Sequence, residues 1–154
     1  MQADLLKTTY ILIAVIAVIL IMVVILLLIR RWRNRPLPMD ELGGHEFEYY
    51  CADLLKSHGF QEATVTKGSG DFGADILAEK DGVSYAVQCK CYDRPIGVKA
   101  IQEVYAGKDF YDCMVGVVMT NQYFTEPAVT MAKKLNIMLW DRGYIDSMEK
   151  ENEH

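Results

Sequence analysis

The feature that most limits how this chain can fold is an apolar run near its N-terminus. Residues 8–29 read TTYILIAVIAVILIMVVILLLI, which is 22 positions without a charged residue, a glycine or a proline. About 20 apolar residues in a helix cross a hydrocarbon core of about 30 Å, and a helix satisfies its own backbone hydrogen bonds there. We therefore expect one transmembrane helix at residues 8–29.

A cleaved signal peptide is the competing interpretation of this run. The apolar core of a signal peptide is about 7–15 residues long and ends at small residues, whereas this run is longer and is followed by RRWRNR at residues 30–35. Basic residues gather on the cytoplasmic side of a membrane span. Four arginines follow the run and only Lys7 precedes it. We therefore expect a single-pass protein of the cell's inner or plasma membrane, with its N-terminus outside and the rest in the cytoplasm.

Five segments follow from this interpretation. They are a short extracytoplasmic N-terminus at residues 1–7, the transmembrane helix at 8–29, a basic, proline-containing linker at 30–39, a folded domain at 40–146 and a polar tail at 147–154. Residues 36–154 carry eleven basic and twenty acidic side chains, a net charge of −9. Proteins that bind nucleic acids usually present a basic face, so this charge argues against a broad phosphate-binding surface.

The folded part shows a regular alternation of helix and strand patterns. We expect a helix that ends near Ser57–Gly59, strands at 63–66, 74–80 and 83–91, a helix at 98–111, a strand at 113–119, a helix at 125–135 with Thr125 as N-cap, a strand at 137–140 and a short helix at 142–150. This order, αβββαβαβ, predicts an α/β fold with a mixed central sheet flanked by helices.

The bend at Asp81-Gly82 predicts which side chains meet across one hairpin. A two-residue loop of this type pairs Lys80 with Val83. Counting back from that pair places Asp75 opposite Gln88, and Lys90 lies two residues further along the same face. One hairpin thus brings a carboxylate, an amide and an ammonium group together.

Two interpretations of this cluster are open. The carboxylate of Asp75 and the amide oxygen of Gln88 suit a hard divalent cation, which lowers the pKa of a bound water, and Lys90 suits the charge that develops in phosphodiester hydrolysis. The same residues could instead form the solvated face of an ordinary antiparallel hairpin. Spacing alone favours the second interpretation.

The motifs resemble a known family in order and spacing. The matching text is GGHEFEYYCADLLKSHGF, TKGSGDFGADILAEKDGVSYAVQCKCY, GVKAIQEVYAGK and VGVVMTNQYFTEPAVTMAKKLNIMLWD. It resembles the Mrr-type (type IV) restriction endonucleases of the PD-(D/E)xK nuclease superfamily. The resemblance implies that residues 40–146 form a nuclease domain with a restriction-endonuclease-like αβββαβ core and that its cofactor is Mg²⁺ or Mn²⁺.

The resemblance also implies roles for single residues. Asp75 in GADI matches the family's metal-binding aspartate, Gln88 and Lys90 in QCK match its (E/Q)xK pair, and Glu46 in HEFE matches the glutamate of the first helix. The expected catalytic set is therefore Asp75, Gln88, Lys90 and Glu46, with Asp75, Gln88 and Glu46 as metal ligands. Spacing alone favours a solvated helix residue for Glu46. Gln102 in IQE matches a recurrent position of the family without a defined role.

The loop at residues 68–73 is either a substrate-facing loop, as the resemblance implies, or a simple turn that uses its glycines. We expect a membrane-anchored, divalent-metal-dependent endonuclease that hydrolyses DNA phosphodiester bonds. The alternative is a non-catalytic nucleic-acid-binding or sensing module that keeps the nuclease fold, and a third interpretation is a nuclease acting on RNA or on junctions. The expected partners are double-stranded DNA, the lipid bilayer, a second copy of the chain and a separate recognition partner.

Overall fold

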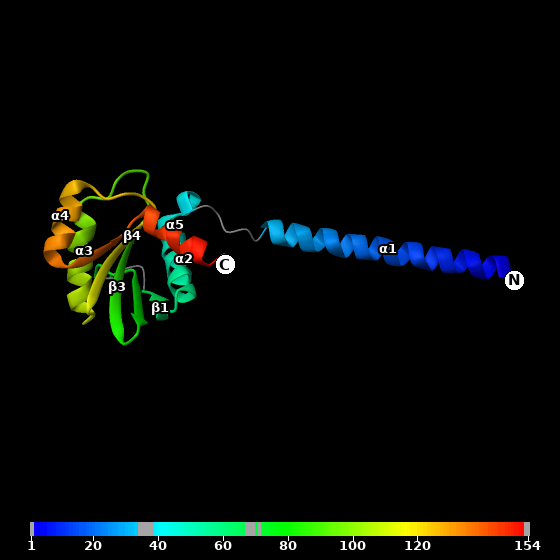
Figure 1. Ribbon diagram of the computed structural model, residues 1–154, viewed down its shortest axis with the longest axis horizontal. Helices are drawn as coiled ribbons and strands as arrows, with labels where there is room; N and C mark the ends of the chain where they lie inside the picture. Colours follow the sequence, from blue (N-terminus) through cyan, green and yellow to red (C-terminus); the bar gives the residue numbers. More distant parts are fainter. Residues whose placement is uncertain (1, 34–38, 67–69, 71, 153–154) are drawn as a thin grey trace. The chain divides into compact units, whose positions relative to one another are not determined.

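The structure is a computed structural model that describes residues 2–33, 39–66, 70 and 72–152, in two compact units, residues 1–36 and 37–154. The first unit is one continuous helix, α1 (Gln2–Arg33) (Figure 1). The side chains described in α1 are those of Tyr10, Ile13 and residues 15–28, and all are exposed. Among the residues that the structure describes, no helix is both long and apolar enough to cross a membrane. The expected transmembrane helix at residues 8–29 is therefore not confirmed.

The second unit contains a five-stranded sheet with helices on both faces. Its elements are a 3₁₀ turn η1 (Met39–Glu41), α2 (Gly44–Ser57), β1 (Gln61–Val65), β2 (Ile76–Lys80), β3 (Val83–Lys90), α3 (Val98–Phe110), β4 (Val115–Thr120), α4 (Glu126–Leu135), β5 (Ile137–Trp140) and α5 (Arg142–Glu151). The strands lie in the order β1-β2-β3-β4-β5. The first three are antiparallel neighbours and the last three are parallel neighbours. The predicted α/β fold with a mixed sheet is confirmed.

Local sequence signals explain where these elements begin and end. Asp81 and Gly82 both have positive φ, 53° and 76°, as a two-residue hairpin bend requires. The register that follows pairs Lys80 with Val83 and continues without a shift to Ile76 and Val87, as predicted. Thr125 caps α4 by accepting a hydrogen bond from the backbone N–H of Ala128 at 3.4 Å.

Some predicted boundaries change. The polar tail expected at residues 147–154 is helical in its first part, because α5 continues to Glu151, and residues 153–154 lie outside the described part. The buried side chains of Ile145 and Met148 hold α5 on the sheet. Within the expected linker at 30–39, α1 extends to Arg33, η1 begins at Met39, and residues 34–38 are likewise outside the described part.

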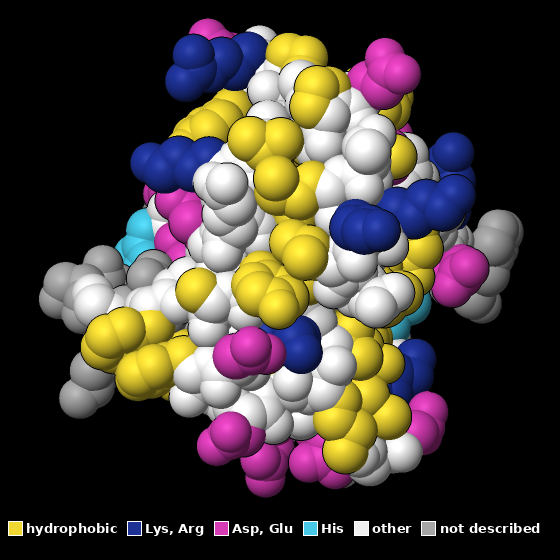
Figure 2. Space-filling view, turned by 90° about the vertical axis from the view of Figure 1, so that its left-hand side faces the viewer, with side chains coloured by type: hydrophobic (Ala, Val, Ile, Leu, Met, Phe, Trp, Pro, Cys, Tyr) yellow, Lys and Arg dark blue, Asp and Glu magenta, His cyan; other side chains and the backbone are white. Residues whose placement is uncertain are grey.

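Two hydrophobic layers enclose the sheet. α2 and α5 pack on one face around Phe47, Leu55, Ile76 and Ile145, while α3 and α4 pack on the other (Figure 1). The second layer includes Ile101, Val104, Val118, Ala128 and Ala132. Figure 2 shows the α4 side, where hydrophobic side chains form a band with basic and acidic side chains beside it. Because both faces of β3 and β4 are covered, the polar side chain of Gln88, two residues before the end of β3, is buried.

Candidate active site

The backbone around Asp75 is fixed on both sides just before β2 begins. Its N–H donates to the carbonyl of Val87 at 2.8 Å, and its own carbonyl accepts from the N–H of Thr66, also at 2.8 Å. One carboxylate oxygen, Oδ2, accepts from the N–H of Cys89 at 2.7 Å and from the amide Nε2 of Gln88. The structure therefore brings Asp75 and Gln88 together across the hairpin, as the register predicted.

Burial separates the two interpretations of this hairpin face. Asp75 is 5% exposed and Gln88 is 4% exposed, whereas residues on a solvated face would be open to water. Removing a carboxylate from water costs several kcal/mol unless hydrogen bonds compensate. The two donors to Oδ2 supply part of that compensation. The hairpin face is therefore buried at Asp75 and Gln88, whereas Glu79, near the bend on the same face, is exposed.

Lys90 lies at the end of β3 and forms an ion pair with α3. Its Nζ is 2.8 Å from Oε2 of Glu103, and Nζ of Lys99 is 3.7 Å from Oε1 of the same carboxylate. Burial lowers the pKa of Lys90. The hydrogen bond and charge of Glu103, together with the charge of Asp75, raise this pKa by more than burial lowers it, so it lies above its ordinary value. Lys90 is therefore a protonated, positively charged group at neutral pH.

Glu103 is a site residue that the sequence motifs did not indicate. Its neighbour Gln102, which matches a recurrent position of the family, is exposed. On α3 the buried positions include Ala100, Val104 and Gly107. Glu103 lies on the same side of the helix, because it follows Ala100 by three residues and precedes Gly107 by four. An acidic residue at the spacing of buried apolar positions was the signal that could have identified it.

The two glutamates of α2 have different surroundings. Oε2 of Glu46 accepts from the N–H of Gly43 at 2.9 Å, which satisfies a free donor at the start of the helix, and Glu46 is exposed. Glu48 is only 19% exposed in its side chain, with Oε2 2.7 Å from Nδ1 of His45. Burial and the neighbouring Cys51 raise the pKa of the Cys89 thiol, and the charges of Asp75 and Glu48 raise it further. Glu48 is therefore the α2 carboxylate whose charge acts on Cys89, the residue after Gln88, and the structure places Glu46 at a helix cap.

Two glycines bring α3 directly against the segment that leads into Asp75. A Cβ added to Gly107 would lie 2.6 Å from the carbonyl carbon of Gly73, and a Cβ on Gly73 would lie 2.1 Å from the carbonyl oxygen of Glu103. Gly73 also has a φ of 93°, which glycine adopts without strain. This contact places Glu103 and Asp75 on neighbouring backbone segments.

The loop at residues 68–73 is described only in part. Residues 68, 69 and 71 lie outside the described part of the chain, as does Lys67. Gly70 and Gly73 have positive φ, which agrees with the interpretation of a turn. The ring of Phe72 stacks on that of Phe110 with centroids 3.9 Å apart, so this end of the loop is packed against α3.

The oxygen atoms of Asp75 and Gln88 have the chemistry that Mg²⁺ or Mn²⁺ prefers. Mg²⁺ is commonly held by one or two carboxylates, with water and substrate phosphate completing its shell. Two protein oxygens therefore fit such an ion, although no group of three His, Cys, Asp or Glu side chains suited to a metal occurs in the described ranges. Gln88 presents its amide nitrogen to Asp75. Binding a cation between them requires this amide to turn, because an amide nitrogen does not bind a cation.

Three solved structures share the fold. A protein of unknown function, AF1548, is 23% identical with a TM-score of 0.58, over 71% of this chain and 66% of that one. The DNA modification-dependent restriction endonuclease AspBHI is 18% identical with a TM-score of 0.55, over 70% of this chain and 31% of its own. MspJI restriction endonuclease, solved in complex with a 27-mer oligonucleotide, is 19% identical with a TM-score of 0.54. The match covers 68% of this chain and 27% of MspJI. The chain thus spans less than two thirds of each of these proteins.

No curated protein matches the chain. The sequence pattern of the restriction endonuclease family Mrr_cat matches residues 39–148, which is more than two thirds of the chain and nearly all of its second unit. The match includes the hairpin with Asp75, Gln88 and Lys90, as well as α3 with Glu103. The chain belongs to the Mrr-type restriction endonuclease family.

Proposed function

We propose that this protein is a divalent-metal-dependent endonuclease that hydrolyses DNA phosphodiester bonds. The observation that carries the proposal is the buried pair of Asp75 and Gln88 beside the charged Lys90, on the hairpin of a restriction-endonuclease domain. A buried carboxylate held by two donors is costly to keep for stability alone. The fold is shared with AspBHI, a DNA modification-dependent restriction endonuclease, and with MspJI bound to an oligonucleotide, which supports DNA as the substrate.

Each group has a distinct role in this proposal. Asp75, and Gln88 once its amide has turned, would hold the cation, which would supply a water of lowered pKa and offset charge on the phosphate. Lys90 stabilises the negative charge that develops on the phosphate oxygens. Glu103 orients the Lys90 ammonium group through their 2.8 Å ion pair. Glu46, whose metal contact the resemblance implied, remains a candidate ligand only if its side chain leaves the N–H of Gly43.

Nicking of a supercoiled plasmid tests the proposal. The full chain, in detergent and with Mg²⁺ or Mn²⁺, is compared with Asp75→Asn and Lys90→Gln, which preserve side-chain size. The matched controls are Asp53→Asn and Lys56→Gln, which alter an exposed ion pair on α2. We expect both site variants to lose about 100-fold or more in rate, while the controls keep the wild-type rate. Equal nicking by wild type and site variants, with the fold intact, would refute hydrolysis at this site.

A non-catalytic binding module is the second candidate. The observation that favours it is the Lys90–Glu103 ion pair, because a lysine neutralised by a carboxylate stabilises a phosphate less well. DNA binding by the full chain without any metal-dependent nicking would support this candidate.

We further propose that α1 attaches the chain to a membrane. The support is the uncharged run at residues 8–29 and the arginines that follow it. The apolar side chains described between Val15 and Leu28 are exposed, which an aqueous surface does not favour. The proposed location is the inner or plasma membrane, with a single span, the N-terminus outside and the nuclease domain in the cytoplasm.

Alkaline carbonate extraction of membranes tests the attachment. We expect the wild-type chain to stay in the pellet and a double variant, Leu20→Lys with Val24→Lys, to be released, because each charge at the centre of a span costs about 2.5–3.5 kcal/mol. A reporter fused to the C-terminus should show cytoplasmic activity. Release of the wild-type chain by carbonate would refute a spanning α1, and an external reporter signal would reverse the proposed orientation.

A further inference from the structure

A pocket adjoins the candidate active site and shares two of its residues, Lys90 and Glu103. It has a volume of about 390 Å³ and lies between the end of β3, the segment after it and the start of α3. Lys90 and Glu103 belong to both the pocket and the site, and the other lining residues include Tyr92, Arg94 and Lys99. This volume lies within the usual range for pockets that bind small ligands or parts of larger ones.

The charge of this pocket is opposite to that of the domain around it. Among the described residues that line the pocket, Lys90, Arg94 and Lys99 are positive and Glu103 is negative, so these residues together carry a net charge of +2. Residues 36–154 as a whole carry −9. A small basic pocket in an acidic domain attracts an anion locally, whereas the rest of the surface repels it.

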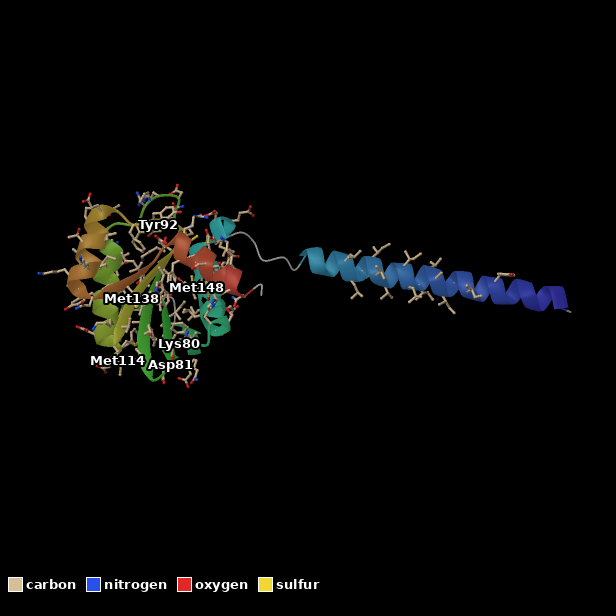
Figure 3. The ribbon with its side chains drawn as sticks, in the orientation of Figure 1. Lys80, Asp81, Tyr92, Met114, Met138 and Met148 are labelled. Atoms are coloured by element: carbon tan, nitrogen blue, oxygen red, sulfur yellow. The ribbon has the colours of Figure 1, made fainter. Side chains whose placement is uncertain are left out.

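Tyr92 is an exposed aromatic ring on a rigidly held backbone. Tyr92 is 47% exposed, and the guanidinium carbon of Arg94 lies 5.8 Å from the centroid of its ring. The N–H of Tyr92 donates to Oδ1 of Asn121 at 2.9 Å, and its carbonyl accepts from Nδ2 of the same side chain at 3.0 Å. Asn121 is itself 2% exposed. A buried amide therefore holds the backbone of Tyr92, which lies at the end of the sheet opposite the Asp81 bend (Figure 3).

The other end of the segment is also fixed. The N–H of Ile96 donates to the carbonyl of Tyr123 at 2.9 Å, and the N–H of Thr125 donates to the carbonyl of Ile96 at 2.9 Å. The wall of the pocket is thus held at both ends by the residues that follow β4. Such a preformed pocket loses little conformational entropy when a ligand binds.

We propose that this pocket binds a single-stranded segment of DNA next to the scissile phosphate, with Arg94 and Lys99 on backbone phosphates and Tyr92 stacked on an unpaired base. The inference rests on the proposed function, since the pocket opens beside Lys90. Proteins that bind single strands combine basic grooves with aromatic rings, because an unpaired base exposes its face for stacking. The base of a duplex is already stacked and offers the ring no such face.

Binding without hydrolysis tests this inference separately from the enzyme activity. The probe is a fluorescein-labelled oligothymidylate, measured by anisotropy with the full chain in detergent and EDTA at several salt concentrations. The variants are Arg94→Gln, Lys99→Gln, Tyr92→Ala and Tyr92→Phe. The matched control is Lys150→Gln, an exposed lysine on α5, which packs on the opposite face of the sheet from α3. Circular dichroism shows whether each variant is folded.

Contacts with phosphates and stacking on a base are expected to differ in how they change the salt dependence of binding. Arg94→Gln and Lys99→Gln should each weaken binding and lower the slope of log affinity against log salt by about 0.7, the value for one phosphate contact on a single strand. Tyr92→Ala should weaken binding by about 5-fold or more at an unchanged slope, while Tyr92→Phe, which keeps the ring face, and Lys150→Gln should bind like the wild type.

The outcomes separate the inference from the proposed function. If the Arg94, Lys99 and Tyr92 variants bind like Lys150→Gln while the wild type nicks plasmid, the pocket inference is wrong and the hydrolytic function stands. If these variants lose binding as predicted but no metal supports nicking, the pocket stands and hydrolysis fails. Tighter binding of a hairpin duplex than of oligothymidylate, or no binding of oligothymidylate by the wild type, would also overturn the inference.

Discussion

The two glutamates of α2 differ by two positions and have opposite surroundings. Glu46 contacts the backbone of Gly43, whereas the charge of Glu48 reaches the Cys89 thiol next to Gln88. We predict that Glu46→Gln lowers the free energy of unfolding by about 0.3–1 kcal/mol and leaves the nicking rate unchanged, because glutamine can keep the hydrogen bond to Gly43 but removes a negative charge from the first turn of the helix. Glu48→Gln should instead lower the nicking rate. Urea unfolding and plasmid nicking measure the two effects, and loss of nicking in Glu46→Gln alone would restore Glu46 as a metal ligand.

Removing the negative charge of the Lys90–Glu103 ion pair is expected to have opposite effects on DNA affinity and on the nicking rate. In Glu103→Gln the pocket loses the negative charge of Glu103, and the Lys90 ammonium group loses its charged partner at 2.8 Å. DNA should bind more tightly because the local charge rises, while nicking should slow by about 10-fold because the ammonium group is no longer held in place. Anisotropy and nicking, with Glu126→Gln on α4 as the control, test this. Faster nicking in Glu103→Gln would show that the carboxylate inhibits rather than orients Lys90.

The contact between α3 and the backbone before Asp75 determines how closely two elements of the site approach. A methyl group on Gly107 would overlap the carbonyl of Gly73. We predict that Gly107→Ala lowers stability by about 1–3 kcal/mol, the usual cost of overpacking, and slows nicking by moving Asp75 away from α3. Gly44→Ala, at the start of α2 where an added Cβ meets nothing within 4 Å, is the matched control. Wild-type stability and rate in Gly107→Ala would show that α3 can move without affecting the site.

Asp40 links η1 to the residue after β4 and to the start of α5. It accepts from Nδ2 of Asn121 at 3.0 Å and pairs with Arg142. The hydrogen bond from Asn121 and the contact with Arg142 outweigh the effect of burial and lower the pKa of Asp40 from its ordinary 3.8. A carboxyl with a lowered pKa stabilises the fold above its unfolded-state pKa and loses this effect as the pH falls through its folded-state pKa.

The pH dependence of thermal unfolding tests this link. The Tm difference between wild type and Asp40→Asn should be constant above about pH 5 and should shrink as the pH falls below the unfolded-state value. Circular dichroism of both full chains across this range provides the measurement. A Tm difference that is constant down to the lowest pH would show that the charge of Asp40 does not stabilise the fold.

At the scale of the whole molecule, each chain carries one candidate site. Breaking both strands of DNA needs two attacks, and a second copy of the chain is the expected source of the other site. We predict that supercoiled plasmid first gives nicked circles and that linear product then forms at a rate that rises more steeply than the protein concentration. Agarose gel analysis of time courses at several concentrations measures this. Linear DNA as the first product, at a rate proportional to protein, would indicate a preformed dimer.

Charge is distributed unevenly over the molecule, and this affects its proposed partners. The N-terminal 35 residues carry five basic side chains and one acidic one, while the remainder carries −9. Because the acidic domain repels DNA over most of its surface, binding through a small basic pocket is expected to be weak and sensitive to salt. A separate recognition partner would supply the affinity and specificity that this surface lacks.

Patterns that act over a few residues could be predicted from the sequence. The Asp81-Gly82 bend determined the hairpin register, and with it the meeting of Asp75 and Gln88, because a two-residue loop allows one pairing. The Thr125 cap and the alternation of strands and helices likewise follow from local geometry. The family resemblance identified the restriction-endonuclease domain, which the match over residues 39–148 confirms.

Other features depended on segments far apart in the chain. The burial of Asp75, the partner of Lys90 and the different surroundings of Glu46 and Glu48 were decided when α2 and α3 packed against the sheet. The basic pocket depends on such a contact, since Asn121, after β4, holds the backbone of Tyr92, after β3. The sequence by itself determined which chemical groups stand on one hairpin. Tertiary packing decided which of them are removed from water, and therefore which charges interact strongly.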